Sequence, residues 1–389
     1  MSEFQNNMLH VTTGERISPT RTADGEPKLP QCPKLMKFYD RIVARKKLSW
    51  TTHLKFRKLL GTGGQGIVYL TERRGSDGFT LPVALKIFSP ERYSSPKEYD
   101  EDMARIGAVG AGVARIQHDN LVVVHNFLDR QRVRMMVMEW VDGFDLRRLL
   151  TPRMFGIVRD RVSEKRWQHI NRVLVTAGPE QPRFKAGVAI AIVRDCLEAL
   201  AALHREGIVH SDIKPANIML KRSGHAKIID IGSAFYFDSP PERRACTPAY
   251  AAIEVLEGEP STHQSDLASL GYVTVELLAG RPVFSGVNDL NTLIKAKRSL
   301  VERLPELLPE EVVCNDLLMT FLRGLVEPDP ADRFSSAEVA ETHEDGAGAF
   351  HRQLIIGDLA SEYENDIRIW IEELVEIDQI HDEETKFLN

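Results

Sequence analysis

The first part of the chain contains strand-like apolar runs, and the second part has apolar residues at helical spacing. The runs at residues 54–60, 66–73 and 81–88 are separated by glycine-rich turns, which predicts an antiparallel meander. Residues 97–117 predict a helix with one apolar face, formed by Met103, Ile106, Val109, Val113 and Ile116. Beyond residue 140 the pattern is mainly helical to about residue 345. We therefore expect an α+β fold of two lobes with a cleft between them.

Both ends of the chain differ from this middle part. Residues 1–33 are polar and interrupted by four prolines, which predicts a poorly ordered leader. Residues 34–58 contain nine Lys or Arg and one acid, Asp40, and include a short basic amphipathic helix. Near the C-terminus, apolar residues step by 3 or 4 along one helix face, whose members are Leu359, Tyr363, Ile367, Trp370, Leu374 and Ile377. The opposite face of that helix is acidic.

The composition of the 389 residues is that of a globular protein, with 43% hydrophobic and 27% charged residues. This excludes a mainly disordered or collagen-like chain. The net charge of −6 is uneven, because residues 358–384 carry eleven acids against Arg368 and the rest sums to +4. Nucleic-acid binding and a membrane span are not expected. The absence of a signal-like apolar run and the four scattered cysteines (Cys32, Cys196, Cys246 and Cys314) predict reduced thiols and a cytoplasmic location.

A glycine-rich motif follows the first predicted strand. In "GTGGQGIV", Gly61, Gly63 and Gly66 match the pattern G-x-G-x-x-G-x-V, in which the backbone can approach phosphate oxygens. Dinucleotide-binding folds use the same spacing, but there the loop opens a helix. Here a β-branched and aromatic run, 67–69, follows, and Lys86 ends the apolar segment "VALK" twenty residues after Gly66. These features favour a nucleotide-phosphate site built on strands.

A second constellation lies in "IVHSDIKPANIML", residues 208–220. Asp212 and Asn217 are five residues apart with Lys214 between them, and Asp230 follows the apolar run of "KIIDIG". Three oxygen-bearing side chains and one cation can hold Mg2+ and a triphosphate while orienting a hydroxyl. The alternative, two ordinary polar loops after strands, requires many spaced positions to agree by chance.

With these motifs the chain resembles a eukaryotic-type (Hanks-type) serine/threonine protein kinase over residues 54–345. The resemblance implies a bilobal protein-kinase fold. A small antiparallel β lobe would cover residues 54–139 and a larger helical lobe residues 140–345, with the ATP cleft between them. An insertion at 151–183, the leader 1–53 and an acidic amphipathic tail 346–389 would be additions to this core.

The resemblance also implies a role for each motif residue. Lys86 would hold the α- and β-phosphates of ATP, Asp212 would accept the proton of the substrate hydroxyl, and Lys214 would neutralise the γ-phosphate. Asn217 and Asp230 would ligate Mg2+, with Mn2+ as the alternative ion. The other nucleotide contacts implied are Gly61, Gly63, Gly66, Val68, Ala84, Glu139, Val141 and Asp145, with Met138 at the back of the adenine pocket.

Further family positions are present. "CTPAYAAIE" (246–254) resembles the end of an activation segment and would place Thr247 near Asp212 and the peptide-docking surface. Asp266 would brace the backbone of the catalytic loop, and Glu254 would pair with Arg333. We interpret these last contacts as structural.

Three motifs depart from the family pattern. The usual His-Arg-Asp contains Ser211 in place of arginine, which removes the cation that would receive a phosphorylated activation loop. We therefore hypothesise a kinase of the non-RD type, active without phosphorylation of that loop. Ile231 replaces the phenylalanine of Asp-Phe-Gly, and Ile253 replaces the proline of Ala-Pro-Glu.

The fourth departure concerns the glutamate that pairs with the strand lysine in active kinases. Its expected position, nine residues before His118, is occupied by Val109. The acids further upstream are Glu98, Glu101 and Asp102, of which Glu101 is favoured as the partner of Lys86. Alternatively, these acids only cap or solvate the start of the helix.

The additions permit two interpretations each. The insertion 151–183 is a surface element packed on the large lobe or a substrate-docking element. The tail helix docks on the kinase body near the basic leader helix, and either regulates activity or simply packs there.

The predicted function is transfer of the ATP γ-phosphate to Ser/Thr hydroxyls of proteins. A nucleotide-binding pseudokinase is the alternative, because of Val109 and Ser211. A small-molecule kinase is disfavoured by Lys214-Pro215 and by "TPAYAAIE".

Overall fold

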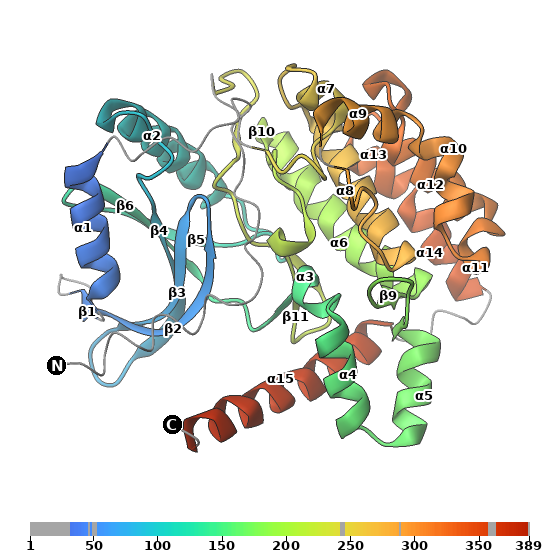
Figure 1. The fold of residues 1–389 in the computed structure, drawn as a ribbon, viewed down its shortest axis with the longest axis horizontal. Coiled ribbons are helices and arrows are strands. Elements are labelled where there is room, and N and C mark those ends of the chain that lie inside the picture. The colour runs from blue at the N-terminus through green and yellow to red at the C-terminus, as the bar shows by residue number, and fades with distance from the viewer. Residues whose placement is uncertain are drawn as a thin grey trace. The chain divides into compact units, whose positions relative to one another are not determined.

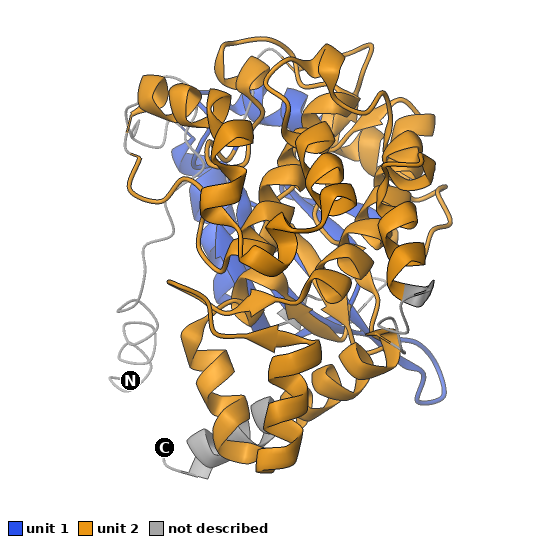
Figure 2. Ribbon diagram, turned by 90° about the vertical axis from the view of Figure 1, so that its right-hand side faces the viewer, with its two compact units in different colours: residues 1–104, 125–140, 242–246 blue, residues 105–124, 141–241, 247–389 orange. Residues whose placement is uncertain are grey.

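The computed structural model describes residues 32–45, 47–48, 53–241, 246–287, 289–356 and 363–387. It divides into two compact units, shown in blue and orange in Figure 2. Unit 1 comprises residues 1–104, 125–140 and 242–246, and unit 2 comprises residues 105–124, 141–241 and 247–389. The predicted leader 1–33 lies outside the described residues except for its last two positions.

Unit 1 is built on a six-stranded sheet of order β1-β2-β3-β4-β6-β5. Its strands are β1 (Lys47–Leu48), β2 (His53–Gly63), β3 (Gly66–Arg74), β4 (Thr80–Phe88), β5 (Val124–Arg130) and β6 (Val133–Glu139). The pairings β2–β3, β3–β4 and β4–β6 are antiparallel, which confirms the predicted meander. β4 is an inner strand, and its residues 83–88 are all buried, as expected for a strand covered on both faces.

The helix α1 (Pro33–Ala44) packs against this sheet within unit 1 (Figure 1). Its apolar face carries Leu35, Tyr39 and Ile42, and the last two join a core formed with alternate residues of β4 and β6. The strand residues of this core are Val83, Leu85, Ile87, Val133, Met135 and Val137. α2 (Pro96–Val113) runs from unit 1 into unit 2 and buries Met103, Ile106 and Val109 on its predicted apolar face.

Unit 2 is mainly helical and is centred on two long buried helices. The helices of this central part are α3 (Leu146–Leu149), α6 (Ala186–Arg205), α7 (Ile253–Leu256), α8 (His263–Ala279), α9 (Leu290–Arg298), α10 (Leu300–Leu307), α11 (Glu310–Val313), α12 (Asp316–Val326), α13 (Ala337–Thr342) and α14 (Ala347–Ile356). Residues 265–279 of α8 are all buried, because α6 and α12 pack on it. The helical second part of the chain is thus confirmed.

Short strands of unit 2 frame the loop at residues 210–217. β7 (Gly143–Asp145), β11 (Ile218–Lys221) and β12 (Ala226–Ile228) form one sheet, with β11 in the middle. β10 (Ile208–Val209) pairs with β13 (Phe235–Tyr236), and the short helix η1 (Pro215–Asn217) leads into β11. The loop that carries the predicted catalytic residues is therefore anchored at both ends by strands.

The insertion and the tail pack together on unit 2. The predicted insertion 151–183 contains α4 (Pro152–Arg161), α5 (Glu164–Val173), β8 (Val175–Thr176) and the first residue of β9 (Arg183–Phe184), which pairs with β8. The predicted tail forms α15 (Tyr363–Phe387). α15 contacts α4, α6, β7 and β11 and runs beside the α4–α5 hairpin in Figure 1.

Specific side chains fix this contact. Trp370 is only 2% exposed and meets the Phe184 ring edge-on at 5.9 Å between centroids. Arg166 of α5 binds Glu373 through Nε at 2.8 Å and Nη2 at 3.2 Å. Ile367 and Leu374 are buried as the helical spacing predicts, whereas Leu359 and the side chain of Ile377 lie outside the described residues.

None of the helices in the described part of the chain is long and apolar enough to cross a bilayer.

Candidate active site

One buried carboxylate holds the loop that follows β10. Asp266, near the start of α8, accepts the backbone N–H groups of His210 and Ser211, each at 2.8 Å. Its Oδ2 also lies 3.0 Å from Nε2 of His204. Burial alone would raise the pKa of Asp266, but these partners outweigh it and hold the pKa below the ordinary value. The predicted bracing role of Asp266 is confirmed.

Ser211 replaces the arginine of the family motif and adopts a left-handed backbone conformation, with φ of 64°. Such a conformation costs energy for a residue with a side chain, so the surrounding contacts must hold it. Two contacts do so: the N–H bond to Asp266 and a hydroxyl contact of 2.9 Å with Ser261.

The Asp212 carboxylate is the centre of the site and is 8% exposed. Lys214 Nζ donates to Oδ2 at 2.7 Å, and Asn217 Nδ2 donates to the same oxygen at 3.1 Å. Thr247 Oγ1 donates to Oδ1 at 2.8 Å and receives Lys214 Nζ at 2.9 Å. The structure thus brings Asp212, Lys214, Asn217 and Thr247 together, and the predicted proximity of Thr247 to Asp212 is confirmed.

Asn217 also links the loop to the segment that carries Asp230. Its Nδ2 donates to the Asp212 carbonyl at 2.8 Å, and its own carbonyl accepts the Ile229 N–H at 3.0 Å. Asp230 follows directly, and its Oδ1 accepts the Gly232 N–H at 2.9 Å. The predicted metal ligands therefore lie on two segments that are joined by a backbone hydrogen bond between Asn217 and Ile229, the residue before Asp230.

The donor set suits a hard divalent cation that is shared with a phosphate substrate. Within the described residues, no three His, Cys, Asp or Glu side chains gather as a closed metal site. Mg2+ commonly takes only one or two protein oxygens and completes its shell with phosphates and water. Asn217 and Asp230 fit that requirement.

In unit 1, the glycine motif forms the turn of the β2–β3 hairpin, where Gly61 pairs with Val68 and Gly63 with Gly66. Gly66 has φ of 141°, and an added Cβ would lie 1.9 Å from the Ile87 carbonyl oxygen. Only glycine fits this position. A Cβ on Gly61 or Gly63 would meet no atom within 4 Å, so the loop backbone there is accessible.

Lys86 lies in β4 opposite Val68 and is 4% exposed. Its Nζ donates to Gln65 Oε1 at 2.7 Å and lies 5.3 Å from the centre of the Phe88 ring. The contact with Gln65, which lies in the glycine loop, was not predicted. A polar residue at the tip of that loop is the sequence signal that could have indicated it.

The acids of α2 make other contacts in the structure. Glu101, the predicted partner of Lys86, lies 3.5 Å from Lys97 and its side chain is 64% exposed. Asp102 accepts Arg92 Nη2 at 2.7 Å, and Glu98 accepts the Ser94 N–H at 2.9 Å. The pairing of Lys86 with Glu101 remains a prediction.

The remaining predicted nucleotide contacts lie on β4, β6 and β7. Ala84 pairs with Met138 across the β4–β6 ladder, and Glu139 ends β6. Val141 is buried just before β7. Asp145 caps α3 by accepting the Arg148 N–H at 3.0 Å, and burial raises its pKa.

The segment after Thr247 is supported by contacts that were only partly predicted. Arg333 binds Glu254 through two nitrogens, at 2.7 and 2.9 Å, which confirms that pair. Tyr250 donates to Glu276 at 2.7 Å, and burial raises the pKa of Glu276. Lys297 of α9 donates to the Ala249 carbonyl at 2.8 Å.

The contact of Lys297 with Ala249 and the hydrogen bond between Tyr250 and Glu276 were not predicted, because the two residues of each pair are far apart in the sequence. The Lys297 ammonium lies 3.8 Å from the Tyr272 ring centre and 4.2 Å from that of Phe284. Tyr272 and Phe284 also line a small cavity of about 130 Å3 with Tyr250 and Glu276.

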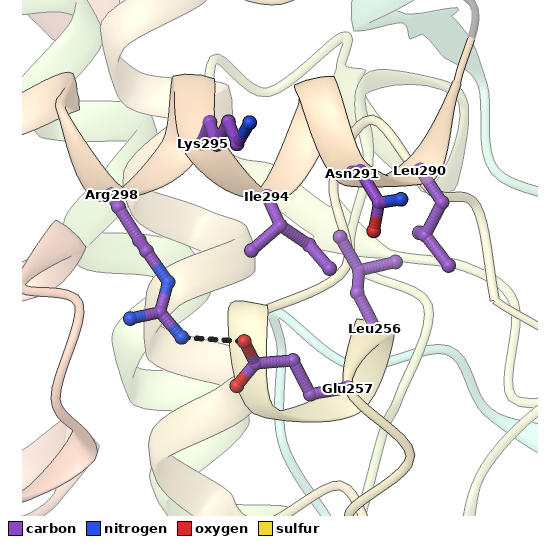
Figure 3. Close-up of a pocket in the computed structure, with 7 residues that line it drawn as sticks. All are labelled: Leu256, Glu257, Leu290, Asn291, Ile294, Lys295 and Arg298. Atoms are coloured by element: carbon purple, nitrogen blue, oxygen red, sulfur yellow. Dashed lines mark hydrogen bonds and ion pairs between the residues drawn. The ribbon is translucent and has the colours of Figure 1, made fainter.

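A larger groove of about 650 Å3 lies between α7 and α9 (Figure 3). Leu256, Leu290 and Ile294 supply its apolar surface, and Arg298 forms an ion pair with Glu257 across it. None of the predicted catalytic residues lines this groove.

A six-stranded sheet with a glycine-rich hairpin and a buried lysine, and a helical unit with an Asp-centred loop, define a protein kinase domain. The protein kinase domain family matches residues 54–343, and the chain belongs to this family.

Named relatives agree with this assignment. The chain is 31% identical to the serine/threonine-protein kinase PkaA of Streptomyces coelicolor, over 72% of this chain and 47% of the relative. It is 30% identical to PkaB of the same organism, over 73% of this chain and 60% of the relative. Identity to the serine/threonine-protein kinase PknL of Mycobacterium tuberculosis is 28%, over 72% and 61%. The chain thus spans about half to three-fifths of the length of these relatives.

Proposed function

We propose that this chain is an ATP-dependent protein kinase that transfers the γ-phosphate to serine or threonine hydroxyls. The observation that carries the proposal is the set of contacts around Asp212. One buried carboxylate there is oriented by Lys214, Asn217 and Thr247 through hydrogen bonds of 2.7–3.1 Å. The names of the relatives support serine and threonine as acceptors. We place the catalytic domain at residues 54–345, with flanking segments at 1–53 and 346–389.

In this mechanism Asp212 orients the acceptor hydroxyl and takes its proton. The reaction forms a bond between the hydroxyl oxygen and the γ-phosphorus, and the bond from that phosphorus to the β,γ-bridging oxygen breaks, so that ADP leaves. Lys214 offsets the charge of the transferring group, and Lys86 holds the α- and β-phosphates. Catalysis by such groups rests on positioning and electrostatic stabilisation.

Asn217 and Asp230 would hold Mg2+, with Mn2+ as the alternative ion. When bound, the cation supplies charge that neutralises the phosphate oxygens. The glycines of the β2–β3 turn, with Val68, Ala84, Glu139, Val141 and Asp145, would contact the nucleotide.

Transfer of labelled γ-phosphate to a generic protein acceptor tests this proposal. The wild type should label serine and threonine in the recovered acceptor, and Asp212→Asn should not. Label on tyrosine alone would contradict the proposed acceptor class. Equal labelling by both proteins would contradict the role of Asp212.

We further propose that activity does not depend on phosphorylation of the activation segment, as in kinases of the non-RD type. The contacts of Ser211 with Asp266 and Ser261 support this, because they hold the loop without an arginine–phosphate pair. Phosphatase-treated protein should keep its rate. A protein that is inert after this treatment and recovers when the segment is phosphorylated would contradict the proposal.

A nucleotide-binding pseudokinase is the second candidate, favoured by Val109 at the glutamate position and by Ser211 in place of arginine. It predicts ATP binding without phosphate transfer. A small-molecule kinase is disfavoured by the contacts of Thr247 with the catalytic loop. A cytoplasmic location remains a prediction from the sequence.

For the tail we propose that α15 docks on unit 2 as a packing element. Its buried Trp370 and the Arg166–Glu373 pair support this role. Deleting residues 356–389 should lower stability, whereas a stable truncated protein with raised activity would indicate autoinhibition.

A further inference from the structure

We propose that Gln65, in the glycine-rich turn between β2 and β3, is a positioning residue for Lys86. This inference rests on the proposed function, because it assigns Lys86 to the ATP phosphates. It starts from one contact in unit 1: Gln65 Oε1 accepts a hydrogen bond from Lys86 Nζ at 2.7 Å.

The backbone of Gln65 is fixed relative to β4, the strand that carries Lys86. Its carbonyl accepts the Ser89 N–H at 2.9 Å. The next residue, Gly66, pairs with Phe88 and approaches the Ile87 carbonyl so closely that no Cβ fits. Gln65 is thus attached to the end of β4 and to the residue after it through its own carbonyl and through Gly66, and its side chain starts from a defined point.

The side chain of Gln65 then determines the direction of the ammonium group. Lys86 has a long, flexible side chain, and ordering it costs conformational entropy. The amide oxygen of Gln65 and the face of the Phe88 ring, 5.3 Å away, give the ammonium two favourable contacts within an almost fully buried environment. Lys86 is therefore oriented before ATP binds, which reduces the entropy lost on binding.

Gln65 lies outside α2, the helix that carries the paired glutamate in the family pattern. Val109 stands at the expected glutamate position and is fully buried. Gln65 offers an oxygen acceptor from a different element, the turn of the β2–β3 hairpin.

The side-chain amide of Gln65 is neutral, which affects how strongly the site around Lys86 attracts phosphate groups. A glutamate beside Lys86 would offset the lysine charge, and it would repel the phosphate groups of ATP at short range. Gln65 orients the ammonium without adding a negative charge. Gln65→Glu should therefore keep kcat near the wild-type value while raising the KM for ATP, whereas Gln65→Ala should lower kcat as well.

The test is a double-mutant cycle in the full chain, with Gln65→Ala, Lys86→Ala and the double variant. In the wild-type background, Gln65→Ala should lower kcat/KM for ATP roughly tenfold or more and leave the KM for the protein acceptor unchanged. In the Lys86→Ala background, the same change should have an effect of less than about twofold. Gln168→Ala, which loses one exposed contact with Glu164, is the matched control.

ATP affinity measured by calorimetry on the same four proteins separates this inference from the proposed function. If the wild type binds ATP but transfers nothing, the kinase proposal fails. The double-mutant cycle on ATP affinity then still tests the contact between Gln65 and Lys86, because the effects of the two substitutions on the affinity should again be non-additive. Additive losses in the two backgrounds, or wild-type affinity and rate in Gln65→Ala, would overturn the inference. Melting temperatures of Gln65→Ala and Gln168→Ala should stay close to the wild type, since neither side chain is buried.

Discussion

At the scale of single residues, Thr247 connects the segment 246–254 to the loop that carries Asp212 and Lys214. Its hydroxyl donates to one oxygen of Asp212 and accepts from Lys214, so one side chain orients both charged groups. Hydrogen bonds to charged groups contribute about 1.5–3 kcal/mol when both partners are fixed. Thr247 is therefore placed to position Asp212 and Lys214, the two groups that we propose act on the hydroxyl and the phosphate.

Removing this hydroxyl should reduce the rate. Thr247→Ala should lower kcat by roughly tenfold or more, in line with the loss of such a bond, and Thr247→Ser should retain most of the activity. The KM for ATP should change little, because among the described residues Thr247 makes no hydrogen bond with those proposed to hold the base, the ribose or the α- and β-phosphates. Thr342→Ala, which removes an exposed hydroxyl on α13, is the control. A Thr247→Ala protein with the wild-type kcat would contradict this role.

Residue motifs with fixed spacing could be predicted from the sequence alone. Asp212, Lys214 and Asn217 lie within six residues of one another, so the local chain brings them together. Glu254 and Arg333 were paired correctly because each belongs to a recognisable motif. Gln65 and Lys297 belong to no such motif, and their contacts depend on how strands and helices meet in space.

At the scale of elements, the α4–α5 hairpin and α15 pack against each other within unit 2. Arg166 and Glu373 are 207 residues apart, so the periodicity of either helix could not predict that they would pair. The apolar stripe of α15 predicted a helix with a buried face, but not the surface that covers it. That surface includes Phe184, and Gly187 of α6, where a Cβ would lie 2.3 Å from the Tyr363 ring.

The burial of Trp370 leads to a prediction about stability. Trp370→Ala should lower the free energy of unfolding by about 3–5 kcal/mol, because it leaves a cavity against Phe184. Denaturant unfolding followed by circular dichroism measures this change. Glu376→Ala, at an exposed position on the same helix, should have an effect of about 0.5 kcal/mol or less. Equal stability of the two variants would show that α15 does not pack on unit 2 as described.

The strand pairing in unit 1 and the apolar face of α2 show what the spacing of apolar residues can predict. The β2–β3–β4 meander and the apolar face of α2 follow from alternation and helical period. The sequence did not show which of Glu98, Glu101 and Asp102 would pair with Lys86. Residues three or four positions apart lie on the same face of a helix, so helical spacing alone cannot separate them.

At the scale of the whole molecule, the histidines His210 and His263 connect stability to pH. Burial lowers the pKa of His210 below the ordinary value of 6.5. Burial, and then the nearby His204, lower that of His263, whose ring stacks on His204 with centroids 4.2 Å apart. Below pH 6.5 the unfolded chain therefore binds protons that the folded chain does not, so stability falls as pH decreases.

The pH dependence of unfolding tests this linkage. The free energy of unfolding should decrease from pH 7 toward pH 5.5, and His263→Gln should make that decrease shallower. The carboxylates Glu254 and Asp266, whose pKa values are lowered in the fold, lose their contribution only at more acidic pH. The two effects occupy different pH windows. Identical slopes for the wild type and His263→Gln would contradict the role of His263.

The central claim concerns the chemistry of Asp212 within a protein kinase domain that covers residues 54–343. The most direct measurement compares kcat for phosphate transfer and the Kd for ATP in the wild type and in Asp212→Asn. A positioned general base contributes about 10²–10⁴-fold to rate. We predict that Asp212→Asn lowers kcat by about that factor and leaves the Kd for ATP and the melting temperature unchanged. An Asp212→Asn protein that transfers phosphate at the wild-type rate would contradict the account.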